Sequence, residues 1–253
     1  MLRNAILCRP CPSITDGITA SNLGKPVLSD ALDQHNKYAE ILQKLGLKTQ
    51  ILPPKTMFPD STFIEDVALC TSRCAIITSP GAASRQGEIK GMKKVLSEYY
   101  VSIEEIKHPA TLEAGDVMMV GDHFYIGISG RTNPEGADQL IKILNKYGLS
   151  GSKVPLMKML HLKSGVSYLE NNNILVCGEF IENKIFDRFN RIIVDDDESY
   201  AANSLWINSK VLVPEGFPKT REKIGQAGYE TITVDVSEFG KIDGGLSCLS
   251  LRF

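Results

Sequence analysis

The 253-residue sequence lacks the patterns that define several large classes of proteins. No apolar run approaches the roughly 18 residues of a membrane helix, and too few apolar residues precede Arg9-Pro10 for a secretion signal. Lys and Arg are scattered and the net charge is only -2, so no basic segment indicates binding to nucleic acid or to an anionic membrane. Six cysteines show no dense disulfide framework. We expect a cytoplasmic protein with reduced thiols that binds neither nucleic acid nor membrane.

The composition, at 43% hydrophobic and 23% charged residues, is sufficient for one large core. Four segments have the pattern of β-hairpins, with two strand-like runs around a turn: 67–77, 117–128, 168–180 and 205–213. We therefore expect one domain over residues 1–253 that is rich in short strand pairs.

Helical patterns fall between the predicted hairpins. Ser29 is expected to cap a helix that ends at Gly46, and Asn133-Pro134 to begin one that ends at Gly148. Weaker helical patterns cover 88–99 and 220–227, and each is followed by a strand-like stretch. Two strands, a helix and a further strand thus recur about five times at a period of about 50 residues, which favours a radially repeated α/β architecture. A doubly wound parallel sheet would need single strands separated by helices, and the hairpin patterns oppose it.

Acidic side chains gather where two of the predicted hairpins begin. Asp60, Glu65 and Asp66 precede the first, and Glu113 and Asp116 precede the second. In a radial fold these segments converge, and clustered carboxylates repel one another unless a cation joins them. The pattern predicts a cationic ligand, and a guanidinium fits best because its planar donors match carboxylates two oxygens at a time.

Two arginines extend this prediction. Arg85 and Arg131 lie in glycine-bearing loops, each between a strand-like and a helical segment. At the same rim as the acids, they would hold the carboxylate of an amino acid whose far end is the guanidinium. The sequence therefore predicts an arginine-like substrate.

Cys248 is the candidate nucleophile. Gly244 and Gly245 free the backbone before it, and the alternation of Leu246, Cys248 and Ser250 predicts a short strand. His161, distant in sequence, is the candidate base, since a cysteine with a remote histidine is a recurrent nucleophile pair. The pair alone does not define the reaction.

Taken together, these segments resemble the dimethylarginine dimethylaminohydrolase family of the guanidino-group-modifying, or pentein, superfamily, in its compact bacterial form. The resemblance runs along the whole chain and is carried, in order, by Phe58-Pro59-Asp60-Ser61, Phe63-Ile64-Glu65-Asp66, Ser84-Arg85, Glu113-Ala114-Gly115-Asp116, Arg131-Thr132-Asn133, His161-Leu162-Lys163 and Asp243-Gly244-Gly245-Leu246-Ser247-Cys248. It implies a five-bladed α/β propeller of repeated ββαβ units.

The same resemblance implies the site residues. Cys248 would be the nucleophile and His161 the general acid/base, with Glu113 orienting the histidine and contacting the guanidinium. The implied substrate-binding residues are Ile18, Asp60, Glu65, Asp66, Arg85, Arg131, Ile242 and Asp243. In that set Asp66 would bind the guanidinium, the two arginines the carboxylate, and Asp60 the α-amino group with main-chain oxygens of Ile18 and Ile242. Neither a metal nor a cofactor is expected, although zinc could inhibit by binding Cys248 and His161.

The implied reaction is hydrolysis of N-omega-methylated arginine, as asymmetric dimethylarginine or monomethylarginine, to citrulline and dimethylamine or methylamine through a covalent S-alkylthiouronium intermediate on Cys248. The thiol is expected to ionise when the cationic substrate offsets the acids of the site. A hydrolase of citrulline or another ureido compound is the first alternative, followed by arginine deiminase-type activity, whose enzymes resemble longer chains. An amino-acid-binding module without turnover is a non-enzymatic alternative. A papain-like protease is disfavoured because its cysteine precedes its histidine. Methylation preference and a homodimeric state are left open.

Overall fold

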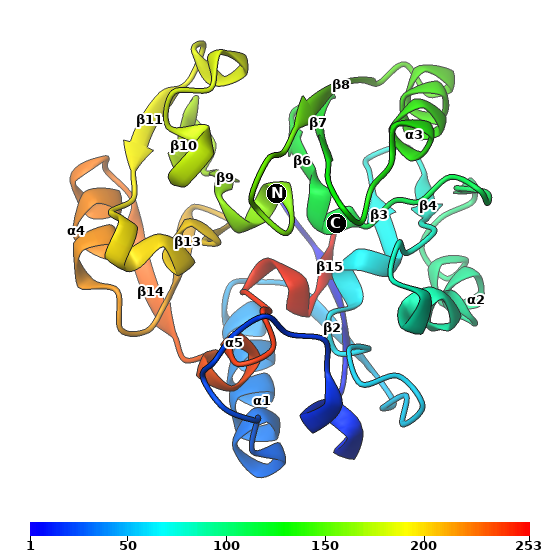
Figure 1. The fold of residues 1–253 in the computed structure, drawn as a ribbon, viewed down its shortest axis with the longest axis horizontal. Coiled ribbons are helices and arrows are strands. Elements are labelled where there is room, and N and C mark those ends of the chain that lie inside the picture. The colour runs from blue at the N-terminus through cyan, green and yellow to red at the C-terminus, as the bar shows by residue number, and fades with distance from the viewer. The chain divides into compact units, whose positions relative to one another are not determined.

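The structure, a computed structural model, describes residues 1–253 and contains five three-stranded β-sheets (Figure 1). The strands are β1 Asn4–Cys8, β2 Lys48–Leu52, β3 Ala68–Cys70, β4 Ala75–Ile77, β5 Ile103–Glu105, β6 Val117–Val120, β7 His123–Ile128, β8 Ser150–Pro155, β9 Val166–Tyr168, β10 Asn173–Val176, β11 Asn190–Ile193, β12 Leu205–Ile207, β13 Lys210–Pro214, β14 Glu230–Val234 and β15 Leu251–Arg252. The sheets are ordered β15-β1-β2, β3-β4-β5, β6-β7-β8, β9-β10-β11 and β12-β13-β14.

Every sheet repeats one pattern of pairing. Its middle strand is antiparallel to one neighbour and parallel to the other. The antiparallel neighbour of β1 is β15, so the first sheet is built from both ends of the chain. A parallel pair requires a crossover connection, and here it usually contains a helix. The predicted repeat of two strands, a helix and a strand is confirmed, and so are all four predicted hairpins.

Five α-helices accompany the sheets: α1 Leu28–Lys44, α2 Met92–Leu96, α3 Pro134–Lys146, α4 Pro218–Gln226 and α5 Ser237–Gly240. Short 3₁₀ helices complete the connections at Pro12–Asp16, Ile64–Val67, Ala83–Ile89, Ala114–Asp116, Leu162–Ser164, Gly178–Phe180, Lys184–Phe186, Asp196–Ala202 and Ser247–Leu249. Between β10 and β11 two of these 3₁₀ helices take the place of an α-helix.

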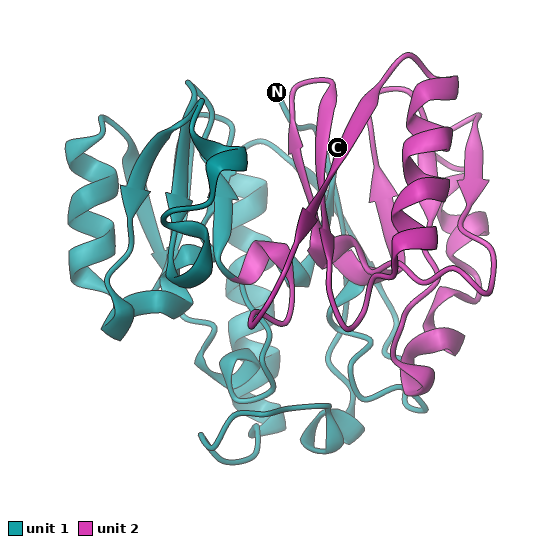
Figure 2. Cartoon of the chain, turned by 45° about the horizontal axis from the view of Figure 1, so that its top comes forward, with its two compact units in different colours: residues 1–64, 165–252 teal, residues 65–164, 253 magenta.

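The chain divides into two compact units, which Figure 2 distinguishes by colour. Unit 1 consists of residues 1–64 and 165–252, and unit 2 of residues 65–164 and 253. Each has an apolar core of its own. Tyr38, Leu42 and Phe239 are fully buried in the core of unit 1, and Phe124 and Leu140 in that of unit 2. The single domain over residues 1–253 stays a prediction.

The starts of α1 and α3 test the two capping residues predicted from the sequence. Asn133 caps α3 as predicted, because its Oδ1 accepts a hydrogen bond from Gly136 N at 2.8 Å. The predicted cap at Ser29 is wrong: this residue lies inside α1, and the preceding N–H of Val27 donates instead to Glu238 Oε2 at 2.6 Å. The side chain of the first flanking residue does not cap α1, and a carboxylate distant in sequence accepts a hydrogen bond from one of the N–H groups at the start of the helix.

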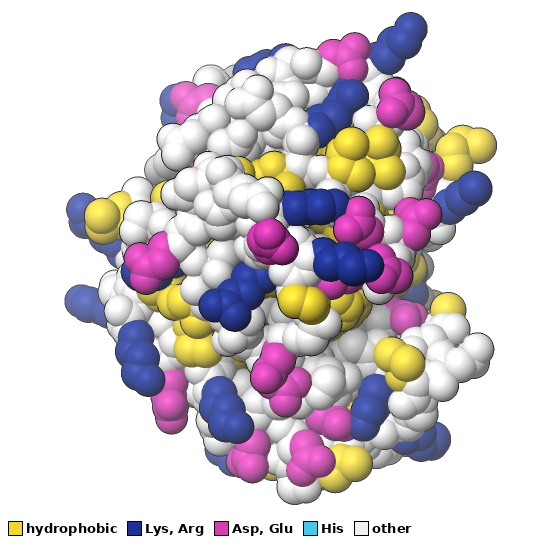
Figure 3. All heavy atoms as spheres, turned by 90° about the vertical axis from the view of Figure 1, so that its left-hand side faces the viewer, with side chains coloured by type: hydrophobic (Ala, Val, Ile, Leu, Met, Phe, Trp, Pro, Cys, Tyr) yellow, Lys and Arg dark blue, Asp and Glu magenta, His cyan; other side chains and the backbone are white.

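None of the helices combines the length and the apolar character that a membrane span requires. On the face drawn in Figure 3, Lys and Arg side chains are interspersed with Asp and Glu side chains.

Candidate active site

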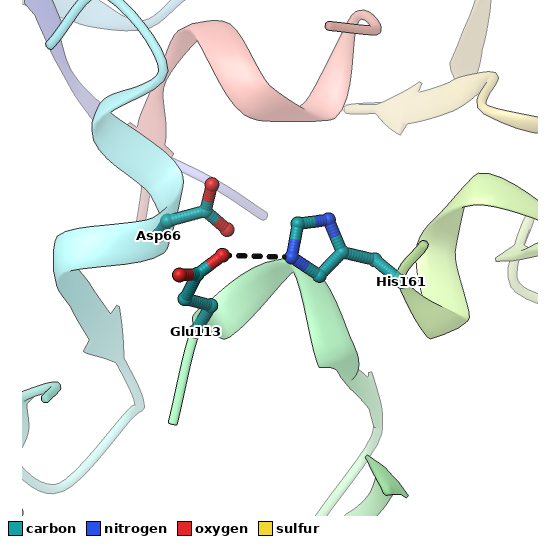
Figure 4. A group of neighbouring side chains, drawn as sticks. All are labelled: Asp66, Glu113 and His161. Carbon is teal, nitrogen blue, oxygen red and sulfur yellow. Dashed lines mark hydrogen bonds and ion pairs between the residues drawn. The ribbon is translucent and has the colours of Figure 1, made fainter. Parts of the chain in front are cut away.

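The predicted histidine and two predicted acids meet in unit 2. His161 Nε2 lies 2.9 Å from Glu113 Oε2, and Asp66 lies beside this pair (Figure 4). His161 is 8% exposed, Asp66 2% and Glu113 0%. The structure therefore brings together, out of solvent, three residues separated by as many as 95 positions in the sequence.

The backbone around Glu113 explains how these side chains approach so closely. Glu113 immediately precedes the 3₁₀ helix Ala114–Asp116, and its Oε1 accepts hydrogen bonds from Gly81 N at 3.1 Å and Ala82 N at 3.2 Å. Gly115 donates its N–H to Asp66 Oδ1 at 2.9 Å. A Cβ on Gly115 would lie 2.8 Å from that oxygen and 3.1 Å from the imidazole ring of His161, so only glycine fits here.

The electrostatics of this cluster favour a protonated histidine. Burial alone would lower the pKa of His161, but Asp66, the hydrogen bond with Glu113 and the charge of Asp116 raise this pKa to about 9. Burial alone would raise the pKa of Asp66, whereas Arg85 and then His161 lower it. At neutral pH the cluster therefore contains an imidazolium held by carboxylates.

Arg85 lies against the acids of the site and is buried. It lies within the 3₁₀ helix Ala83–Ile89 and is 4% exposed. Its Nη1 donates to Asp66 Oδ2 at 2.6 Å, while its Nε and Nη2 donate to Glu88, with the shortest distance 2.9 Å. Arg85 thus holds Asp66 in place through a buried, fork-shaped pairing.

Arg131 and Lys163 add two further cations. Arg131 Nη1 lies 3.5 Å from Glu113 Oε1, and its side chain is 18% exposed, in the predicted loop between β7 and α3. Lys163 Nζ lies 2.7 Å from Glu65 Oε1. Both cations are therefore paired with acids that the sequence assigned to substrate binding or catalysis.

These pairs contradict one expectation from the sequence, that the acids of the site have no positively charged partner until a cationic ligand binds. Each of four acids lies against a cation of the chain itself: Glu65 against Lys163, Asp66 and Glu88 against Arg85, and Glu113 against Arg131 and His161. The chain itself supplies the countercharge, because a carboxylate buried without a cation would be strongly destabilising.

The nearest ligand atoms of Asp66, Glu113 and His161 lie within 4.8 Å of one another, a spacing in which carboxylates and an imidazole can hold a metal ion. Here these atoms are hydrogen-bonded within the cluster, with Asp66 on Arg85 and His161 on Glu113. A metal would have to displace the proton of the imidazolium, since histidine binds metals in its neutral form. The observed arrangement is that of an ion-pair cluster.

Cys248 lies in unit 1, at the centre of the 3₁₀ helix Ser247–Leu249. The strand predicted here is wrong, since β15 begins only at Leu251. Asn203 fixes this turn: it accepts from Ser247 N at 2.9 Å and donates to Ser247 Oγ at 3.0 Å. Gly245 N donates to Cys248 Sγ at 3.5 Å. Among the six cysteines Cys248 alone is half-buried and the others are buried, which suits a reactive thiol.

The predicted contacts for an α-amino group also gather in unit 1. Asp60 Oδ1 accepts from Ile18 N at 3.0 Å, and a Cβ on Gly17 would touch both Asp60 and Ile242. Asp243 has a positive φ of 59° and accepts from Ala20 N at 2.6 Å. Ile18, Asp60, Ile242 and Asp243 thus belong to one small region around the segment that follows Gly17.

Three residues that organise the cluster in unit 2 have no individual role predicted from the sequence. Glu88 pairs with Arg85, and its position three residues later is a spacing at which helical side chains can pair. Lys163 pairs with Glu65. Asp116 is completely buried with hydrogen-bonded partners.

Comparisons with known proteins identify the family. A family model described as "N,N dimethylarginine dimethylhydrolase, eukaryotic" matches residues 20–249. The chain is 55% identical to N(G),N(G)-dimethylarginine dimethylaminohydrolase of Pseudomonas aeruginosa, with 100% of both chains covered. The chain belongs to the dimethylarginine dimethylaminohydrolase family.

Solved structures of this family agree with the assignment. A cysteine-to-serine variant of the Pseudomonas aeruginosa enzyme, complexed with citrulline, matches with a TM-score of 0.99 at 54% identity, covering 100% of each chain. A histidine-to-glycine variant of a dimethylarginine dimethylaminohydrolase, as an adduct with S-methyl-L-thiocitrulline, matches with a TM-score of 0.98 at 54% identity and the same coverage. The predicted family, α/β pentein fold and enzyme class are confirmed.

Proposed function

We propose that this dimethylarginine dimethylaminohydrolase family member hydrolyses N-omega-methylated arginines to citrulline and a methylamine, with Cys248, His161 and Glu113 as its catalytic residues. The observation that carries the proposal is the buried pair of His161 and Glu113, with the pKa of the imidazole raised to about 9. Such a pair presents a proton to a leaving amine at neutral pH. The named activity of the Pseudomonas aeruginosa relative supports the choice of substrate.

The first half of the proposed reaction forms the covalent intermediate. The Cys248 thiolate attacks the central guanidinium carbon, a C–S bond forms, and the C–N bond to the methylated nitrogen breaks. His161 gives its proton to the departing amine. Because the imidazole is already protonated, it does not take the thiol proton, which leaves to solvent. His161 Nε2 is held by Glu113, so Nδ1 is the nitrogen that donates.

The second half uses the same imidazole in the opposite sense. Once His161 has lost its proton, it is neutral and accepts one from water, whose oxygen attacks the S-alkylthiouronium carbon. The C–S bond breaks, the thiolate leaves, and the new C–OH group loses the second proton of the water, which gives neutral citrulline and reprotonates the thiolate. The histidine ends protonated, as it began, so the net proton released to solvent is the one that the guanidinium brought.

Each charged part of the substrate is proposed to bind side chains of the opposite charge. Asp66 and Glu65 are proposed to bind the guanidinium, while Arg85 and Arg131 bind the carboxylate. Arg131 is better placed than Arg85 to bind the substrate carboxylate. Its contact with Glu113 is long, at 3.5 Å, whereas Arg85 already makes short hydrogen bonds to two acids. Asp60, Ile18, Ile242 and Asp243 are proposed for the α-amino group.

A substrate panel tests the proposal. Purified enzyme is given asymmetric dimethylarginine, monomethylarginine, arginine and citrulline, and citrulline, ornithine and released amine are measured. Methylated arginines should be turned over fastest. Cys248→Ser should lose nearly all turnover, because a serine hydroxyl is far less ionised than a thiol at neutral pH. The matched control is Cys177→Ser, at a buried cysteine whose Sγ donates to Ser199 O, and it should retain turnover.

A trapping arm tests the histidine. His161→Gly should form an adduct on Cys248 with a substrate that carries a good leaving group, visible by mass spectrometry, and should fail to hydrolyse it. Full turnover by His161→Gly, or more than a few per cent activity in Cys248→Ser, contradicts the assigned roles. Fastest turnover of citrulline or arginine would favour the ureido hydrolase or the deiminase-type alternative, and binding without turnover the binding module. Light scattering of the same sample determines whether the enzyme is a homodimer.

A further inference from the structure

Asp116 is a fully buried carboxylate that the proposed reaction does not use. Its Oδ2 accepts hydrogen bonds from Ser129 Oγ and from Thr132 Oγ1, both at 2.7 Å. Its Oδ1 accepts from Leu162 N at 3.0 Å. Two side chains and one main-chain group, from two separate loops of unit 2, therefore converge on one carboxylate.

The hydroxyls of Ser129 and Thr132 connect the Asp116 carboxylate to main-chain N–H groups. A carboxylate only accepts hydrogen bonds, so both hydroxyls must point their protons at Asp116 and offer their lone pairs elsewhere. Ser129 Oγ accepts from Arg131 N at 3.0 Å and from Thr132 N at 3.2 Å. Thr132 Oγ1 accepts from Glu113 N at 3.1 Å. The charge on Asp116 thus fixes the direction of a small hydrogen-bond network.

The ends of this network are residues of the candidate site. It reaches the main chain of Glu113, of Arg131 and of Leu162, the residue after His161. Gly127 on β7 makes room for it, because a Cβ there would lie 2.9 Å from Asp116 Oδ1. The three chain segments that carry Glu113, Arg131 and His161 are therefore hydrogen-bonded, directly or through one hydroxyl, to the buried carboxylate of Asp116.

We propose that Asp116 is a positioning residue of the family's reaction, which sets the backbone of Glu113, Arg131 and His161 through Ser129, Thr132 and Leu162 N. This inference rests on the proposed function for the roles of those three residues. Asp116 has no contact with substrate in this scheme. Its effect on catalysis arises from geometry, and small displacements of catalytic groups reduce rates strongly.

The negative charge of Asp116 has a second effect on the same site. With Asp66 and Glu113 it is one of three carboxylates that favour the protonated form of His161. Replacing Asp116 by an isosteric neutral side chain should therefore alter the histidine as well as the network. A carboxylate that acted on the fold alone, with no charge near the imidazole, would leave the pKa of His161 unchanged.

The test compares Asp116→Asn with Glu198→Gln. Glu198 is the matched control, because it is another buried carboxylate, in unit 1, that accepts from Lys219 N, Thr220 N and Thr220 Oγ1. The pKa of His161 is read by NMR of the imidazole. Asp116→Asn should lower this pKa by about one unit or more, and reduce kcat by about tenfold or more. Glu198→Gln should shift neither, whatever its effect on stability.

Ser129→Ala and Thr132→Val keep the charge of Asp116 and remove one hydroxyl each, which maintains the test if Asp116→Asn fails to fold. Ser129→Ala should mainly raise KM through Arg131, and Thr132→Val should mainly lower kcat through Glu113. Wild-type kcat and KM in both variants would overturn the proposal. So would an unchanged His161 pKa in folded Asp116→Asn, or an equal shift in Glu198→Gln. The NMR reading needs no turnover, so it is independent of whether methylated arginines prove to be the substrate.

Discussion

The protonated state of His161 should make the stability of this protein fall in mildly alkaline solution. The pKa of His161 is raised from its ordinary 6.5 to about 9 in the folded state. A raised pKa adds stability that is complete below pH 6.5 and lost as the pH rises through 9. At about 1.4 kcal/mol per pKa unit, the full contribution is about 3 kcal/mol, of which about 2 kcal/mol disappears between pH 7 and pH 9.

Urea unfolding at pH 7, 8 and 9 measures this loss in the wild type and in His161→Asn, which cannot ionise in this range. The wild type should lose about 2 kcal/mol more than the variant between pH 7 and pH 9. His123→Asn is the control, because the ring nitrogens of His123 lie 2.8 and 3.0 Å from the hydroxyls of Ser150 and Ser152, and it should follow the wild type. Parallel curves for the wild type and His161→Asn would refute the argument that the cluster holds a proton.

Two further predictions concern stability. Lys163→Met leaves Glu65 without the cation at 2.7 Å and should lower the free energy of unfolding by about 3 kcal/mol. The double variant Lys163→Met with Glu65→Gln should recover at least half of that loss, because it also removes the buried charge. Equal urea midpoints for the single and double variants would contradict a compensating pair. Gly244→Ala would place a Cβ 2.1 Å from the ring of Phe63 and should destabilise the protein by about 2 kcal/mol or more. The control is Gly225→Ala in α4, which has open space around it and should stabilise the protein by about 1 kcal/mol. A Gly244→Ala protein as stable as the wild type would show that the ring of Phe63 can move aside.

The elements that sequence alone predicted are those with local causes. The hairpin of β6 and β7 was predicted because Gly121 and Asp122 provide a turn between two apolar runs, and α3 because Asn133 and Pro134 provide its cap and first turn. The repeated order of strands and helices then follows from the succession of such signals along the chain.

The errors arose where a distant side chain determines local structure. The alternation around Cys248 predicted a strand, but the double hydrogen bond of Asn203 with Ser247, 44 residues apart, selects a 3₁₀ turn. For the candidate site, the sequence indicates the residue types but not how they pair. The bonds that bury Arg85 beside Asp66 and Lys163 beside Glu65 join separate segments, and no periodicity in the sequence reveals them.

The use of both chain ends in one sheet has a consequence for synthesis on the ribosome. Apart from Phe253, unit 2 is a single continuous stretch, so nearly all of its residues are available once the chain has grown past Ser164. The sheet of β1 and β2 instead waits for its third strand until Leu251 and Arg252 are released from the exit tunnel. Because chains fold progressively as their residues emerge, the segment that carries Cys248 is expected to become ordered after the histidine cluster of unit 2. The histidine cluster is thus expected to form in the nascent chain before the thiol has been translated.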